Sequence, residues 1–160
     1  MGMQLPGWLR QALEYAGYDW PATDESVLFD WAQQWNGLAN QAAGMAAQAR
    51  SAVGIVTAHN SGEGANAFAD FMNSPDSNIA NLANFGKGAN AIGIGCNIVA
   101  GIVVTLKLAV IAQLVTLAAA IASAVATAGL ASGAALAARE VAKRLIEAAI
   151  NIAVEQIMGG

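Results

Sequence analysis

The stretch LANFGKGANAIGIGCNIVAGIVVTLKLAVIAQLVTLAAAIASA, residues 82–124, decides the fold. Its apolar residues recur at alternating steps of three and four, which places them along one side of a helix packed against other helices. The predicted seam consists of Leu82, Phe85, Ala89, Ile92, Cys96, Val99, Val103, Leu106, Val110, Gln113, Leu117, Ala120 and Ala124. The residues that flank this seam are largely apolar too. A helix that is apolar on most of its circumference lies in the centre of a bundle or in a membrane.

A second long helix is predicted to begin at Thr23-Asp24-Glu25-Ser26, which offers capping side chains and acids near the positive end of the helix dipole. After this start, one series of apolar residues repeats the same alternating steps of three and four residues. The series is Leu28, Trp31, Trp35, Leu38, Ala42, Met45, Ala49, Ala52 and Val56. Asn36-Gly37 could form a turn inside the run. The unbroken spacing favours one continuous helix.

The remaining segments predict shorter helices. An N-terminal helix and linker occupy 1–22, with Trp8, Leu9, Ala12 and Leu13 as one apolar stripe. A loop and short helix with Phe68, Phe71 and Met72 turned inward occupy 59–74, and a possible turn covers 128–133. An amphipathic helix within 132–158 carries a stripe of Val141, Leu145, Ala148 and Ile152. We therefore predict an all-α fold in one domain, 1–160. It is an elongated antiparallel helical bundle whose long helices span 23–58 and 75–128, with one amphipathic C-terminal helix and short end helices.

Composition excludes several classes of protein. Hydrophobic residues make up 56% of the chain and charged residues only 11%, which is the opposite of a disordered composition. The net charge is −4, and the seven basic residues are scattered along the chain. They do not form the cluster that non-specific binding to nucleic acid needs. The first residues have neither the basic nor the apolar region of a signal peptide. Any export is therefore expected to follow a signal-peptide-independent route to the cell surface or the medium.

No residue constellation predicts catalysis, a cofactor or a metal. His59 is the single histidine and lies in a predicted loop, and Cys96 falls on the apolar seam. Glu63 has no partner that would make an acid–base pair. Gly86-Lys87-Gly88 lacks the glycine spacing and the hydroxyl residue of a phosphate-binding loop. We predict that the chain is not an enzyme.

The membrane is the main alternative environment. Residues 108–138 contain no charged side chain, and a bilayer span needs only about 20 apolar residues. The stretch is mostly alanine, which contributes little to insertion, and no belt of Trp or Tyr flanks it. A packed bundle is therefore favoured over a constitutive span, and later insertion of residues 88–138 stays open.

A series of short motifs comes in a particular order along the chain. The series is Pro6-x-Trp8-Leu9, Gly17-Tyr18-Asp19-Trp20-Pro21, Asp24-Glu25, Trp31-Ala32, Trp35-Asn36-Gly37, Gly62-x-Gly64 with Phe68, and Lys107 in a long apolar helix. This order resembles the N-terminal Trp-x-Gly-type domain of actinobacterial polymorphic toxins, the group of the mycobacterial outer membrane channel and necrotizing toxin protein. The resemblance covers roughly residues 4–155. It marks Trp8, Trp20, Pro21, Trp31, Trp35 and Gly37 as motif and interaction residues.

The resemblance implies a delivery role rather than an activity. Such domains are similar to the small helical-hairpin substrates of type VII secretion, pair with helical partners and precede a C-terminal toxin. No toxin part follows here, so the resemblance implies an N-terminal domain or a stand-alone relative. Small members place Trp-x-Gly at a hairpin turn, whereas the heptad here runs through it. Their export signal, Tyr followed four residues later by an acid, comes after the second helix. Tyr15-x-x-x-Asp19 fits the letters but precedes the Trp motif, so a partner chain is expected to supply that signal.

Two functions follow from these expectations. The first is a non-catalytic delivery module that pairs with a helical secretion partner or with itself, with Trp31 and Trp35 as anchors or as core residues of this chain. The second is a membrane-inserting pore or translocation domain that uses residues 88–138, with Lys107 and Gln113 facing water or each other.

Overall fold

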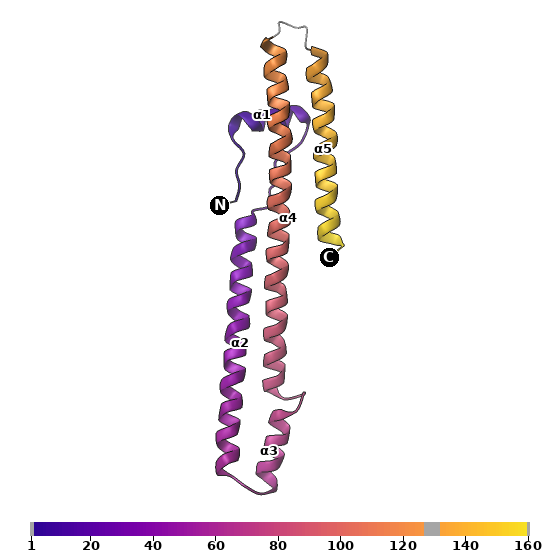
Figure 1. The fold of residues 1–160 in the computed structure, drawn as a ribbon. Helices are drawn as coiled ribbons and strands as arrows, with labels where there is room; N and C mark the ends of the chain where they lie inside the picture. The colour runs from indigo at the N-terminus through magenta and orange to yellow at the C-terminus, as the bar shows by residue number, and fades with distance from the viewer. Residues whose placement is uncertain (1, 127–131, 160) are drawn as a thin grey trace. The chain divides into compact units, whose positions relative to one another are not determined.

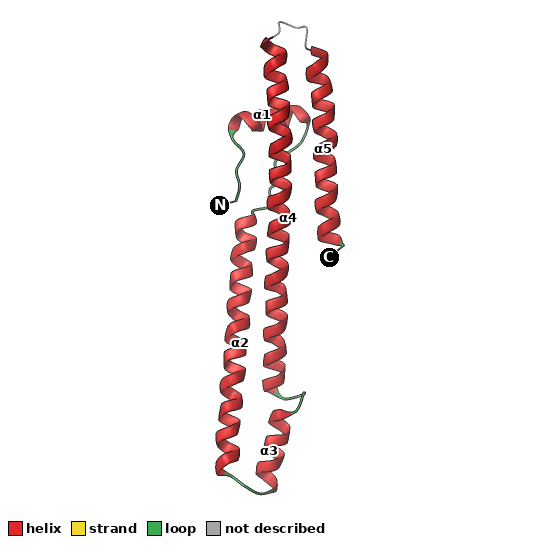
Figure 2. Ribbon diagram, in the orientation of Figure 1, coloured by secondary structure: helices red, strands yellow, loops and turns green. Residues whose placement is uncertain are grey.

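The computed structural model describes residues 2–126 and 132–159, and all regular structure within them is helical (Figures 1 and 2). The helices are α1 (Gly7–Ala16), α2 (Glu25–His59), α3 (Glu63–Asn73), α4 (Asn78–Ala126) and α5 (Ser132–Met158). The predicted all-α class is confirmed. The turn predicted over 128–133 falls mainly outside the described residues. Helix α2 continues through Asn36-Gly37, as the spacing favoured.

The chain forms two compact units, which are described separately. The terminal unit comprises Met1–Leu28 and Ile98–Gly160, and the hairpin unit comprises Phe29–Asn97. The terminal unit contains α1, the C-terminal part of α4 and α5. The hairpin unit contains most of α2, all of α3 and the N-terminal part of α4, and its two long segments run in opposite directions (Figure 1).

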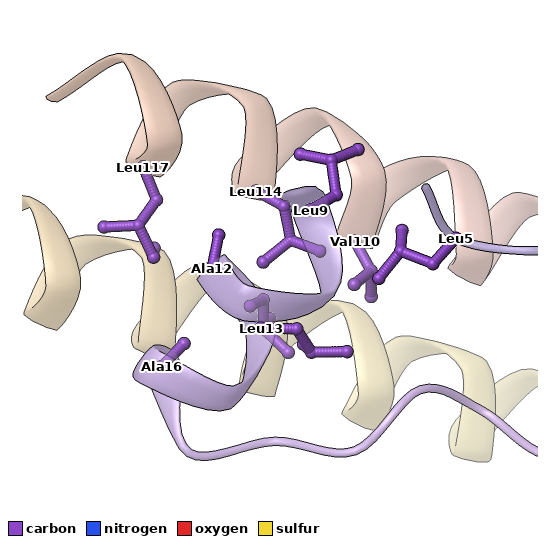
Figure 3. Close-up of a cluster of buried hydrophobic side chains, with 10 residues drawn as sticks. Leu5, Leu9, Ala12, Leu13, Ala16, Val110, Leu114 and Leu117 are labelled. Carbon is purple, nitrogen blue, oxygen red and sulfur yellow. The ribbon is translucent and has the colours of Figure 1, made fainter. Parts of the chain in front are cut away.

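The core of the terminal unit joins α1 to α4 and α5. Helix α1 ends at Gly17, whose φ of 87° is the left-handed conformation that glycine adopts without strain, and its N–H bonds to Leu13 and Glu14 close the helix. Figure 3 shows the apolar side of α1 lying against α4. The buried cluster consists of Leu5, Leu9, Ala12, Leu13, Ala16, Val110, Leu114, Leu117, Ala142 and Ile146. Trp8, predicted to lie in the α1 stripe, is instead 57% exposed.

Polar contacts also fasten α1 and its linker to α5. Tyr18 donates its hydroxyl to Glu147 Oε1 at 2.6 Å, and Arg139 Nε donates to the carbonyl of Tyr15 at 2.8 Å. The Arg139 guanidinium also lies 5.2 Å from the centroid of the Tyr15 ring. Burial and the carboxylate of Glu147 raise the pKa of Tyr18 to about 12. The N-terminal segment is thus held to α5 by side chains as well as by apolar packing.

The hairpin unit is packed through small residues. The buried row on α2 has strict seven-residue spacing and consists of Ala32, Ala39, Ala46 and Val53. The matching row on α4 consists of Ile79, Gly86 and Gly93, and α4 continues this row in the terminal unit with Ala100, Lys107 and Leu114. The other predicted rows are confirmed in part, because Ala42, Ala89, Val103, Val110 and Leu117 are buried as expected.

One predicted row on each long helix is wrong by one position. Trp31, Leu38 and Met45 on α2, and Phe85 and Ile92 on α4, are exposed rather than buried. The reason is close approach: a Cβ added to Gly86 would lie 3.3 Å from the Ala39 carbonyl oxygen and from Ala42 Cβ. Helices this close have no space for aromatic or branched side chains between them, so the row of small residues turns inward.

The same displacement occurs on α5. Val141, Leu145 and Ile152 of the predicted stripe are 57%, 44% and 55% exposed, and Ala148 is exposed as well. The residues one position further, Ala142, Ile146 and Ala153, are buried. In α3, Met72 packs on the α2–α4 cluster as predicted, whereas Phe68 and Phe71 are exposed. Periodicity located the seams to within one position; small residues turn inward on α2 and α4, whereas on α5 Ile146 is buried and Ala148 is exposed.

Candidate interaction surface and buried charge cluster

The outward row of α2 forms an apolar surface in the hairpin unit. Trp31 is 51% exposed and Met45 is 59% exposed. Trp31, Gln34, Trp35 and Leu38 line a shallow pocket of about 440 Å³. An indole with half of its surface in water leaves a large apolar area available for binding.

The outward row of α4 extends this surface. Phe85 and Ile92 each directly precede a glycine of the buried row, just as Trp31 and Leu38 each directly precede an alanine of the buried row. In an antiparallel helix pair, rows that lie one position before the seam on both helices face the same side of the pair. We call this surface, formed by Trp31, Leu38, Met45, Phe85 and Ile92, the apolar face.

The Trp-x-Gly motif lies at the edge of the α2–α4 contact. Trp35 is half-buried and lines the same pocket as Trp31. The Asn36 side chain points toward α4, where a Cβ added to Gly93 would lie 2.4 Å from Asn36 Oδ1. That oxygen is buried and accepts no hydrogen bond from the described residues. A Cβ added to Gly37 would meet nothing within 4 Å, so this glycine does not mark a close contact in this chain.

A charge cluster is buried in the terminal unit. Lys107, on the buried row of α4, is 2% exposed, and its Nζ donates to Glu25 Oε2 at 2.6 Å and to the Thr23 carbonyl at 2.7 Å. Glu25 also accepts a hydrogen bond from the Met3 N–H. Burial raises the pKa of Glu25, but the Lys107 ammonium and the Met3 amide outweigh it and hold that pKa below its usual range.

Trp20, one of the predicted motif residues, belongs to this cluster. Its Nε1 donates to the Met3 carbonyl at 3.2 Å, and its ring centroid lies 5.6 Å from Lys107 Nζ. Neighbouring Pro21 is half-buried. Of the predicted residues, Trp8, Trp20 and Pro21 lie in the terminal unit, and Trp31, Trp35 and Gly37 lie in the hairpin unit. The structure brings Trp31 and Trp35 to one pocket.

Sequence reasoning identified Lys107 as part of a motif order but missed its partner. It gave Lys107 a partner, water or Gln113, only for a membrane-inserted state; in this structure the ammonium is buried against Glu25 from the start of α2. The available signal was the seven-residue series Gly86, Gly93, Ala100, Lys107, because a charge on a buried row requires a counter-charge. The sequence indicates Glu25 as part of a helix start and of the motif order, and not as the partner of Lys107.

The groups considered for chemistry do not come together. Within residues 2–126 and 132–159, no three histidine, cysteine or carboxylate side chains are placed to share a metal ion. His59 is exposed at the end of α2 with its Nδ1 2.8 Å from the Ile55 carbonyl oxygen, and Cys96 is a half-buried free thiol.

One stretch has the length and composition of a membrane span. Among the described residues, Glu63–Ala120 contains an 18-residue window with a mean hydropathy of 2.4, of which 28% is buried inside the protein. A core helix of a soluble protein satisfies the same measure of length and composition, so this property alone does not assign a membrane.

Comparison with known proteins bears on the whole chain. The family model described as WXG100 like domain matches residues 3–149. No curated protein and no solved structure gives a match. The WXG100-like family consists of non-enzymatic secreted helical proteins that are associated with type VII secretion and signal-peptide-independent export. WXG100 proteins typically pair helix to helix as dimers. Because the matched residues and the all-helical architecture agree over most of its length, this chain belongs to the WXG100-like domain family.

Proposed function

We propose that this chain is a non-catalytic delivery and interaction domain, of the kind found at the N-terminus of toxin-like proteins. It enters type VII secretion when a helical partner covers the apolar face. The observation that carries the proposal is the inverted packing of the hairpin unit, with alanine and glycine inside and Trp31, Leu38 and Met45 outside. Full burial of one such side chain contributes about 1.5–3 kcal/mol, so a partner gains much by covering the row.

The partner's contact is expected to centre on the pocket at Trp31 and Trp35. Buried tryptophans are among the residues that dominate binding energy at interfaces. The motif glycine is not required for close helix approach here, since the space around Gly37 is open. In this proposal the two tryptophans are the anchors, and Gly37 has no packing role within the chain.

Export of a reporter fusion tests the proposal. The chain is fused to a reporter enzyme in a host with a type VII system, and reporter activity in the medium is compared with and without the secretion ATPase. Export is expected to need the ATPase and to fall strongly in Trp31→Gln and Leu38→Gln. The exposed polar site Gln41 supplies the matched control, Gln41→Ala. Equal export of all variants, with helicity unchanged by circular dichroism, would exclude the apolar face as the recognised surface.

A second candidate function is membrane insertion by residues 88–138, and the apolar, mostly unburied window within Glu63–Ala120 favours it. Insertion would have to separate Lys107 from Glu25, which costs several kcal/mol per unpaired buried ion. Flotation with anionic liposomes at neutral and mildly acidic pH distinguishes the two functions. Protein that stays at the bottom of the gradient at both pH values contradicts insertion, and protease protection of residues 88–120 in the floated fraction supports it.

A further inference from the structure

A groove opens in the hairpin unit on the side of α2 and α4 opposite the apolar face. Its volume is about 480 Å³. It is lined by small residues, among them Ala43 and Gly86, which we call its floor, and by polar side chains of both helices. These polar residues are Asn40, Arg50, Lys87 and Asn90. We call this surface the basic groove.

The charges of the hairpin unit are divided unevenly between this groove and the rest of the surface. Residues 29–97 contain two cationic side chains, Arg50 and Lys87, and both line the groove. The four carboxylates of the same segment lie elsewhere. They are Asp30, Glu63, Asp70 and Asp76. A surface that collects both cationic side chains of the hairpin unit, in a protein of net charge −4, attracts anions of a partner.

Neither cation has a counter-charge among residues 2–126 and 132–159. No carboxylate of the described residues lies within ion-pair distance of Arg50 or Lys87, and both side chains are exposed. Two amide side chains, Asn40 and Asn90, add donors and acceptors beside them. The groove therefore presents unpaired donors above a floor of small side chains.

The floor and the spacing of the cations both suit a helix. Alanine and glycine allow a helix backbone to pack closely, at about 8–10 Å between axes. Gly86 lies level with Ala39–Ala43 on α2, so Lys87 lies about nine residues from Arg50 along the groove, or roughly 14 Å at the helical rise. Carboxylates about two turns apart on a docked helix reach both cations through their flexible side chains.

We propose that the basic groove binds an acidic helix of a partner protein, one that carries carboxylates at positions i and i+7 or i+8. The proposal rests on the proposed function, because it supplies the chemistry of the secretion partner. The apolar face provides contact area, and the basic groove selects a partner by charge. Opposite charge at an interface governs specificity and association rate more than total affinity.

The test uses the full chain and two alanine-based helical peptides with glutamates or glutamines seven residues apart. Fluorescence anisotropy is expected to show the Glu peptide binding at least about ten-fold more tightly than the Gln peptide, with the difference shrinking as salt rises. The double variant Arg50→Gln/Lys87→Gln should remove the preference. Arg10→Gln, which neutralises an exposed cation in α1, should retain it.

A steric variant separates groove binding from loose attraction. Ala43→Leu fills the floor while both cations remain, so it should weaken binding of both peptides. Equal binding of the Glu and Gln peptides, or unchanged binding in Ala43→Leu, overturns the proposal. The proposal is also overturned if inorganic phosphate binds in a way that depends on Arg50 and Lys87 while the Glu peptide does not bind.

Export separates failure of this inference from failure of the proposed function. If the reporter fusion with Arg50→Gln/Lys87→Gln is exported like wild type while Trp31→Gln is not, the apolar face stands and the basic groove is not used. If both are exported like wild type, neither surface is recognised.

Discussion

The terminal unit and the hairpin unit differ in the size of the side chains that they bury between their helices. The terminal unit buries large side chains, among them Leu13, Leu114 and Ile146, which are 2%, 0% and 1% exposed. The hairpin unit buries Ala32 and Ala46 and turns its tryptophan and leucine row outward. Burial of large apolar side chains is the main source of folding free energy. The terminal unit thus gains more of its stability from large buried side chains, and the hairpin unit leaves the tryptophan and leucine row of α2 exposed.

The largest effect is expected from breaking the ion pair of the terminal unit. Glu25→Gln leaves the Lys107 ammonium buried without a counter-charge, because the pair is 2.6 Å long and its side chains are 8% and 2% exposed. Removing one partner of such a pair costs about 3–5 kcal/mol. Urea denaturation measures this cost. It is carried out on the two single variants, Glu25→Gln and Lys107→Met, and on the double variant. The double variant should be clearly more stable than Glu25→Gln alone. If the loss of unfolding free energy in the double variant equals the sum of the losses in the two single variants, the two groups do not interact.

A matched pair of leucine truncations compares the two units directly. Leu114→Ala should cost about 2–5 kcal/mol, since this side chain is fully buried in the α1–α4–α5 core. Leu38→Ala, on the apolar face, should change the free energy of unfolding of the isolated chain by no more than about 0.5 kcal/mol. Chemical denaturation measures both. A large loss in Leu38→Ala would show that the apolar face already packs within the chain.

The close contact of α2 and α4 predicts a smaller loss for an added methyl group. Gly93→Ala would bring Cβ against Asn36 Oδ1 and the Ala32 carbonyl oxygen, and overpacking of this kind costs typically about 1–3 kcal/mol. Shortening the neighbour in Asn36→Ala/Gly93→Ala should recover part of that loss. Thermal unfolding by circular dichroism checks it, with Gly95→Ala as the control, because a Cβ there meets nothing within 4 Å. Equal stability of Gly93→Ala and Gly95→Ala would contradict the close contact.

The sequence predicts the helices better than their orientation. Heptad spacing located α2 and α4 and half of their buried rows, because periodicity depends only on which residues are apolar. It could not choose between Trp31 and Ala32, or between Ile92 and Gly93, because both members of each pair are apolar or small and lie next to each other on the helix. The choice depends on how closely the helices approach, which is a property of the pair.

The candidate site was predictable to the same degree. The motif indicated Trp31 and Trp35, and the structure adds that Trp31 is exposed and that half-buried Trp35 lines the same pocket. The Lys107–Glu25 pair was not predicted, since its members are 82 residues apart and no local pattern links them. The uneven distribution of charge between the basic groove and the rest of the hairpin unit could not be predicted, because it depends on which sides of the two helices line the same groove.

Acid should weaken the terminal unit through two identified carboxylates, Glu25 and Asp24. The pKa of Glu25 is held below its usual range by Lys107 and the Met3 amide in spite of burial, and the hydrogen bond from Ser26 is the main cause that lowers the pKa of Asp24 to about 2. The unfolded chain therefore binds protons at these carboxylates at higher pH than the folded chain. Their contribution is complete above the unfolded pKa values, about 4. It is lost as pH falls from there through the folded values.

Urea denaturation between pH 7 and pH 2 measures this loss. The free energy of unfolding should be nearly level down to about pH 5 and should then decline. The double variant Glu25→Gln/Lys107→Met should decline less steeply than wild type, whereas Asp30→Asn, at an exposed position of the hairpin unit, should leave the slope unchanged. If the double variant keeps the full slope, the acid sensitivity arises elsewhere. If it loses most of the slope, the carboxylate that fixes the start of α2 to α4 is the chain's main acid-sensitive contact, and the hairpin unit adds little to it.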